Sequence, residues 1–108
     1  MAVALMIELE GMNETVYDEL CDRVELREDP PDGLIFHAAG PAPSGWRIVD
    51  VWDTPDHWET YFAETVKPAI DDIARLHGYD SIERSRVTTW DLAGYSMGPG
   101  PLVNSASL

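Results

Sequence analysis

The sequence has little of several residue types on which particular classes of protein depend. Its single cysteine, Cys21, cannot form an internal disulfide and leaves any zinc site without a second thiolate ligand. Seven basic residues face twenty acidic ones, which gives a formal net charge of -13. A surface this negative repels phosphate backbones and anionic lipid. We therefore expect neither nucleic acid nor a membrane as a partner.

Long hydrophobic runs and nucleotide-binding motifs are missing as well. The sequence contains no phosphate loop, no Rossmann fingerprint and no Ser-His-Asp spacing. The apolar start of the chain becomes acidic at Glu8 and carries no basic residue, unlike a signal peptide. No stretch approaches the roughly 18 apolar residues that a membrane span needs. We therefore expect a cytoplasmic protein.

Hydrophobic periodicity and turn residues predict six elements in a chain long enough for one core. Strands are predicted over 2–9, 34–40, 45–52 and 81–92, and helices over 13–26 and 54–78. Residues 1–92 are expected to form a single domain. The Gly-, Pro- and Ser-rich segment 93–108 is expected to be a flexible C-terminal tail.

The two predicted helices carry recognisable start and stop signals. Asn13 is the expected N-cap of the first, and Thr54 followed by Pro55 begins the second. Pro68 predicts a kink or a fresh start, because proline cannot continue an undisturbed helix. The apolar stripe expected to be buried beyond it consists of Ala69, Ile70, Ile73, Ala74 and Leu76.

The order βαββαβ predicts an α+β, ferredoxin-like fold, in which two helical segments cover one face of a four-stranded antiparallel sheet. In such a sheet the strands should alternate apolar and polar residues if the other face meets water. Residues 2–7 and most of 34–39 are instead apolar at both parities. We therefore expect a homodimer, in which a second copy covers the open face.

Certain residues in this order resemble a known family. The segment Val51-Trp52-Asp53-Thr54-Pro55-Asp56-His57-Trp58 is similar to the strand-end tryptophan and capped helix of the dimeric α/β-barrel superfamily, and within it of antibiotic-biosynthesis-monooxygenase-like (ABM) domains. Gly40, Gly45 and Trp46 around the hairpin fit this pattern, as does Lys67-Pro68 in the helical region. The resemblance covers about residues 2–92.

The resemblance implies a ligand pocket between sheet and helices, but several chemistries. Characterised members include cofactor-free oxygenases of polyphenolic aromatics, haem-degrading enzymes, isomerases and stress-responsive proteins. Haem-degrading members carry a polar residue, often asparagine, inside the first strand, whereas residues 2–7 here have none. A haem-binding protein, with His57 or His77 as iron ligand, is the less favoured alternative.

His37 and Asp50 are the candidate catalytic residues. An imidazole inside an apolar strand must be hydrogen-bonded or functional. If the loop 41–44 sets the pairing, Gly40 opposes Gly45 and His37 opposes Ile48, which makes Asp50 a diagonal neighbour of His37 on the same face. Such a pair holds one imidazole tautomer and suits a general base. The alternative is a core histidine bonded to a nearby carbonyl.

Four aromatic residues are candidates for binding a small aromatic substrate. Trp46 and Trp52 share the predicted face of His37, while Tyr17 and Tyr61 point from the helices toward the sheet with hydroxyls that could orient a phenol. The alternative for all four is plain packing of the core.

The leading hypothesis is a cofactor-independent monooxygenase or isomerase. In it His37 deprotonates a phenolic or enolic aromatic compound, and the resulting anion reacts with dioxygen or rearranges, so that no metal or other cofactor is expected. The alternative is a dimer of the same fold that binds a small ligand, or responds to stress, without catalysis.

Overall fold

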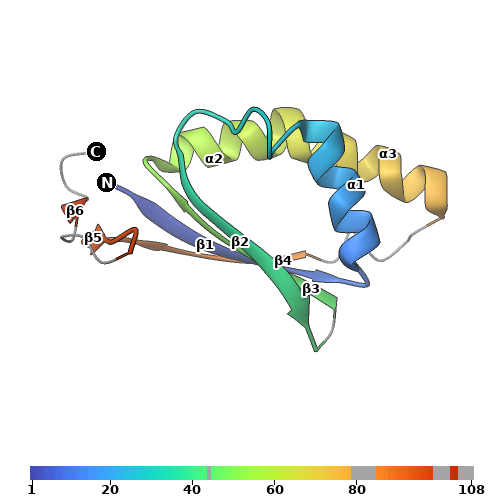
Figure 1. Cartoon of the computed structure of the whole chain (residues 1–108), viewed down its shortest axis with the longest axis horizontal. Coiled ribbons are helices and arrows are strands. Elements are labelled where there is room, and N and C mark those ends of the chain that lie inside the picture. The colour runs from blue at the N-terminus through green and yellow to red at the C-terminus, as the bar shows by residue number, and fades with distance from the viewer. Residues whose placement is uncertain (44, 79–84, 99–102, 105–108) are drawn as a thin grey trace.

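The computed structural model describes residues 1–43, 45–78, 85–98 and 103–104. Its elements are β1 (Val3–Glu10), α1 (Glu14–Val24), β2 (Leu34–Ala42), β3 (Gly45–Trp52), α2 (Pro55–Tyr61), the π-helical stretch η1 (Phe62–Val66), α3 (Lys67–His77), β4 (Ser85–Asp91), β5 (Gly94–Tyr95) and β6 (Val103–Asn104). Figure 1 shows the helices lying together on one side of the main sheet, whose other side they leave uncovered.

The main sheet confirms the predicted ferredoxin-like arrangement. It is antiparallel, with strand order β2-β3-β1-β4. Alternate residues of the two central strands face the helices and form one core with them. The most buried members of this core are Val3, Leu5, Leu9, Met12, Val16, Trp52 and Ile73.

Local sequence signals account for the ends of α1. The Asn13 side chain accepts a hydrogen bond from the Val16 amide at 2.9 Å, which satisfies one of the free donors of the first turn. Glu25, in the left-handed conformation with φ 56°, ends the helix. Between these caps Val16, Leu20 and Cys21 form the buried stripe.

The second helical segment runs in three parts, with the break that Pro68 predicts. Thr54 caps α2 by accepting a hydrogen bond from the His57 amide, and Pro55 occupies the first turn. The chain then widens into η1, where the Lys67 amide donates to the Phe62 carbonyl five residues back, and α3 begins at Lys67. Since Pro68 lacks an N–H and its ring crowds the preceding turn, a wider turn before it avoids part of that conflict.

The predicted apolar stripe on α3 includes one residue that the structure does not bury. Ile73 is fully buried, and Ala69, Ile70 and Ala74 pack against the core, but Leu76 is 67% exposed. Leu76 was predicted to be buried, and that prediction is wrong. At 100° per residue it lies beside the stripe of residues 69, 70, 73 and 74, not within it. Gly78 ends the helix as predicted, with φ 71°.

The hairpin of β2 and β3 is tighter than its sequence suggests. Strand β2 continues through Pro41 to Ala42, so that Ala42 pairs with Gly45 and Gly40 with Arg47. The predicted pairing of Gly40 with Gly45, and of His37 with Ile48, is therefore wrong by two residues. Pro41 is tolerated because β2 is an edge strand, where a missing N–H breaks no ladder. A shift of two preserves the face of every side chain.

The C-terminal part of the chain adds a small hairpin. Strand β4 begins at Ser85, and the predicted strand residues 81–84 lie outside the described residues. Within the segment predicted to be a flexible tail, Gly94 pairs with Asn104 and Tyr95 with Val103. Among the described residues, no helix is long and apolar enough to cross a membrane.

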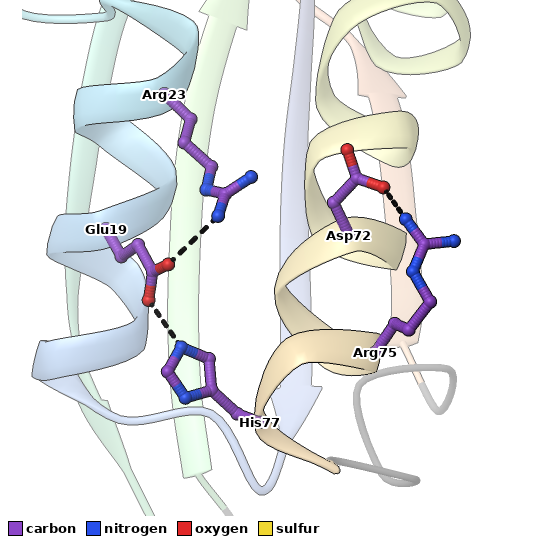
Figure 2. Close-up of polar contacts among 5 residues, drawn as sticks. All are labelled: Glu19, Arg23, Asp72, Arg75 and His77. Atoms are coloured by element: carbon purple, nitrogen blue, oxygen red, sulfur yellow. Dashed lines mark hydrogen bonds and ion pairs between the residues drawn. The ribbon is translucent and has the colours of Figure 1, made fainter.

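A charged contact links the two long helices. Figure 2 shows Glu19 of α1 lying between Arg23 of the same helix and His77 at the end of α3. The Glu19 carboxylate lies 2.9 Å from Nε2 of His77 and 3.3 Å from the Arg23 guanidinium. The contact lies on the helix side of the sheet, away from the uncovered face.

Candidate functional site

An apolar cavity lies between the sheet and the helices. Its volume, measured as the space open to the centre of a water molecule, is about 60 Å³. Its walls are mainly aliphatic and aromatic, and they carry the polar groups of Tyr17, His37, Asp50 and Tyr61. Apolar walls with a few convergent polar groups are typical of small-molecule pockets, but this volume is well below the roughly 300–1,000 Å³ of sites that enclose drug-sized ligands.

His37 and Asp50 meet in this cavity because the strands place them directly opposite each other. His37 of β2 pairs with Asp50 of β3, and Nδ1 of His37 lies 2.6 Å from Oδ1 of Asp50. Asp50 is a buried charged residue, 8% exposed. A buried carboxylate needs hydrogen-bond partners, and His37 supplies one of them.

Trp52 supplies the second partner of Asp50. Its indole Nε1 donates to Oδ2 of Asp50 at 3.2 Å. An ionised carboxylate only accepts, so the partner atom of His37, Nδ1, carries a hydrogen. The neutral imidazole then has its lone pair on Nε2, the nitrogen available to a base reaction.

The side chain of Tyr17 is hydrogen-bonded to this second nitrogen, Nε2. Its hydroxyl makes a short hydrogen bond with Nε2 of His37. The two rings are nearly parallel, with centroids 6.0 Å apart. Burial raises the pKa of the Tyr17 phenol well above its ordinary value. Tyr17 therefore stays neutral and donates its hydrogen to His37.

The remaining aromatic candidates occupy different places. Trp52 and Tyr61 line the cavity, with ring centroids 5.7 Å apart. Trp46 is not among the described residues that line it. Its ring packs against Tyr17 at 5.2 Å, and its buried indole nitrogen has no hydrogen-bond partner within the described part of the chain. Trp46 thus touches the site through Tyr17.

Some residues of the site were not singled out from the sequence. Trp58 and Phe62 line the cavity and pack edge to face, and Cys21 lines it as well. The spacing of four residues between Trp58 and Phe62 is typical of a buried helix face, but it does not show that a cavity lies there.

A second His–Asp pair lies outside the cavity lining. Oδ1 of Asp53 lies 2.6 Å from Nδ1 of His57, and both side chains are partly exposed. The hydrogen bond and charge of Asp53 raise the pKa of His57. Desolvation acts to raise the pKa of Asp53, yet hydrogen bonds from His57 and Thr54 hold it below its ordinary value. The sequence spacing of four residues was the available signal for this pair.

The residues do not fit the haem alternative. Neither His57 nor His77 is among the described residues that line the cavity, and each is engaged by a carboxylate, Asp53 or Glu19. In the described part of the chain, no three His, Cys, Asp or Glu side chains are grouped to hold a metal ion.

Comparison with known proteins gives a match at the level of structure. No protein-family model matches the sequence. No curated protein matches it significantly. A candidate antibiotic biosynthesis monooxygenase from Deinococcus radiodurans shares the fold with a TM-score of 0.54 at 16% sequence identity, over 94% of this chain and 100% of that one.

Two other solved structures are similar. SnoaB, a cofactor-independent oxygenase from Streptomyces nogalater, gives a TM-score of 0.51 at 14% identity, over 92% of this chain and 96% of its own. A dimeric ferredoxin-like protein of unknown function from Thermobifida fusca gives 0.54 at 10% identity, over 85% and 92%. At these identities the likeness shows the fold alone, and at that level the predicted resemblance to ABM-like proteins is confirmed.

Proposed function

We propose that this protein is a small-molecule enzyme in which His37, oriented by Asp50, removes a proton from a phenolic or enolic aromatic compound. The observation that carries the proposal is the Tyr17 hydroxyl at Nε2 of His37. Tyr17 is itself a phenol, so its position is a direct example of a phenol bound to the imidazole lone pair. In the reaction the substrate hydroxyl takes the place of the Tyr17 hydroxyl.

The proton donors and acceptors of the site suit this step. The substrate O–H proton moves to Nε2, and the imidazolium that forms is stabilised by the carboxylate 2.6 Å from Nδ1. Tyr17 is not suited to act as the base itself, because its burial disfavours the phenolate that would accept the substrate proton. His37 is thus the proposed base, and Tyr17, Trp52 and Tyr61 are the proposed binding residues, with Trp46 supporting the Tyr17 ring.

The substrate anion then reacts with dioxygen as the oxidant. Carbon–oxygen bond formation on the electron-rich ring, followed by loss of water, converts a phenol and one dioxygen into a quinone and one water. No electrons from a further reductant are required. That a cofactor-independent oxygenase shares this fold supports dioxygen as co-reactant, and the apolar walls would shield the anion from water.

A non-catalytic ligand-binding protein is the second candidate. It is favoured by the same Tyr17 contact, since the Tyr17 hydroxyl already caps the imidazole in a cavity of about 60 Å³. In this case His37 and Asp50 serve only to satisfy each other's buried polar groups.

We further propose that the protein is a homodimer through the uncovered sheet face. Phe36 and Trp90 on this face are 41% and 45% exposed, and Val51 of β3 and Ala4 of β1 lie between them. Large exposed apolar side chains grouped on one face are typical of an interface. One protein of the same fold is described as dimeric.

The function is tested by oxygen uptake with 1-naphthol and with anthrone, an enolisable ketone, in the presence of a metal chelator. The expected result is uptake by the wild type, reduced at least about a hundredfold in His37→Gln, the usual contribution of a general base. His57→Gln, which alters a histidine outside the cavity lining, is the matched control and should retain activity. Uptake no faster than in buffer, or unaffected by His37→Gln, would favour the ligand-binding alternative.

The dimer is tested by sedimentation equilibrium of the wild type, Trp90→Glu and Leu76→Glu. A charge at Trp90 should give monomers, whereas a charge at Leu76, exposed on α3, should leave the dimer intact. A monomeric wild type would exclude the proposed interface.

A further inference from the structure

The cavity holds one polar group that neither the fold nor the proposed base explains. The hydroxyl of Tyr61 is buried and has no hydrogen-bond partner among the described residues. Buried polar groups in native proteins are almost always hydrogen-bonded, and exceptions often mark functional positions. Tyr61 also lines the cavity, so a bound molecule can reach it.

The surroundings of Tyr61 fix the role that its hydroxyl can play. Desolvation raises the pKa of Tyr61 to about 12, and the neighbouring Cys21 and Asp50 act in the same direction. The phenol is therefore neutral and keeps its hydrogen to donate. Tyr61 and His37 both line the cavity, so one bound molecule can contact both side chains.

The backbone around Tyr61 holds this residue in place. Tyr61 is the last residue of α2, immediately before the π-helical stretch η1, and its ring packs on Trp52. Short π-helical stretches within α-helices occur frequently at functional sites. Trp52 in turn donates to Asp50, so that one aromatic residue braces both the Tyr61 ring and the carboxylate that orients His37.

Resting on the proposed function, we infer that Tyr61 is a second polar anchor, and that the ligand is a flat vinylogous acid with an ionisable hydroxyl for His37 and a conjugated carbonyl for Tyr61. When His37 takes the hydroxyl proton, the electron pair left on the substrate delocalises through the ring to the carbonyl oxygen. A donor aimed at the atom where negative charge develops stabilises the anion more than the neutral substrate. Simple phenols, which have no such oxygen, leave Tyr61 unsatisfied.

The test compares two probes of similar size, 4-hydroxyacetophenone, which has the carbonyl, and 4-ethylphenol, which lacks it. Binding is measured by calorimetry in the wild type, Tyr61→Phe and His37→Gln, and ionisation of bound 4-hydroxyacetophenone by its absorbance. Tyr61→Phe should weaken 4-hydroxyacetophenone about tenfold, the loss of one hydrogen bond, and change 4-ethylphenol less than about twofold. Without ligand, Tyr61→Phe should melt no earlier than the wild type, because it removes a hydroxyl that has no partner.

The outcomes separate this inference from the proposed function. If His37→Gln abolishes ionisation but Tyr61→Phe weakens both probes equally or neither, the base stands and the carbonyl anchor is overturned. If the Tyr61 effect is specific to 4-hydroxyacetophenone but ionisation does not depend on His37, the base is overturned and the anchor stands. Failure of the wild type to bind 4-hydroxyacetophenone more tightly than 4-ethylphenol would also overturn the anchor.

Discussion

Asp50 lies directly opposite His37 in the neighbouring strand, with 2.6 Å between Oδ1 of the carboxylate and Nδ1 of the imidazole. The other carboxylate oxygen accepts the Trp52 indole N–H. Because each oxygen has its own donor, the carboxylate is fixed, and it fixes the imidazole tautomer in turn. The proposed role of His37 as a base depends on this arrangement.

Removal of the Tyr17 hydroxyl should expose the imidazole lone pair. In Tyr17→Phe the ring packing against Trp46 is retained while the hydrogen bond to Nε2 is lost. We expect His37 to react faster with diethyl pyrocarbonate, by about fivefold or more, which corresponds to a hydrogen bond of ~1 kcal/mol. Peptide mass mapping separates His37 from His57 and His77, whose rates should not change. An unchanged rate at His37 would mean that Tyr17 does not cap it.

The register of the apolar stripe on α3 is testable with two alanine variants. Ile73→Ala should lower the free energy of unfolding by about 2–5 kcal/mol, since it leaves a cavity in a fully buried site. Leu76→Ala should change it by less than about 0.5 kcal/mol, because Leu76 is exposed. Urea unfolding of both variants measures the difference, and comparable losses would contradict the packing of α3.

Gly33 is required where it lies. It has φ +87°, and a Cβ at this position would overlap Nδ1 of His57 and Oδ1 of Asp53. Gly33→Ala should therefore cost about 1–3 kcal/mol of stability and separate the His57–Asp53 pair. Gly40→Ala is the control, since its added Cβ meets no atom within 4 Å, and it should be nearly neutral. The comparison again uses urea unfolding, and a stable Gly33→Ala would show that the loop can move away.

The His57–Asp53 pair should make stability depend on pH in a defined window. The pKa of His57 is raised by Asp53, so its contribution is complete below the unfolded histidine value and is lost as pH rises through the folded one. The pKa of Asp53 is lowered, so its contribution is present above the unfolded aspartate value and is lost as pH falls through the folded one. Wild type should exceed His57→Gln in stability at about pH 5, with the difference gone by about pH 8 or above.

The check on this prediction is the double variant His57→Gln with Asp53→Asn. The double variant and His57→Gln both lack the His57–Asp53 pair. Their free energies of unfolding should therefore change with pH in the same way between these limits. A wild type whose advantage grows as pH rises would contradict the sign.

The sequence was sufficient for the fold because its signals are local and repeat along the chain. Caps at Asn13 and Thr54, the left-handed Gly78 and the strand periods together define the βαββαβ order. The shared face of His37 and Asp50 also followed, since strand parity survives a register shift of two residues. The shift itself depended on how far β2 continues past Pro41, which an edge strand leaves open.

Features that depend on how the helices dock were not available from the sequence. The contact of the Tyr17 hydroxyl with Nε2 of His37 requires the position of α1 above the sheet. Leu76 was misplaced because its spacing lies at the margin of a stripe, where only the neighbouring element decides burial. The unpartnered Tyr61 hydroxyl is likewise a property of its surroundings.

The most direct test of the account is the tautomer of His37, read from the ¹⁵N chemical shifts of its ring nitrogens in wild type and Asp50→Asn. The wild type should carry its hydrogen on Nδ1, with Nε2 accepting from Tyr17. In Asp50→Asn the amide oxygen should keep the Trp52 N–H, which turns the amide NH₂ toward His37 and moves the imidazole hydrogen to Nε2. A wild-type His37 with its hydrogen on Nε2, or a tautomer unchanged by Asp50→Asn, would contradict the central claim that Asp50 orients His37 as a base.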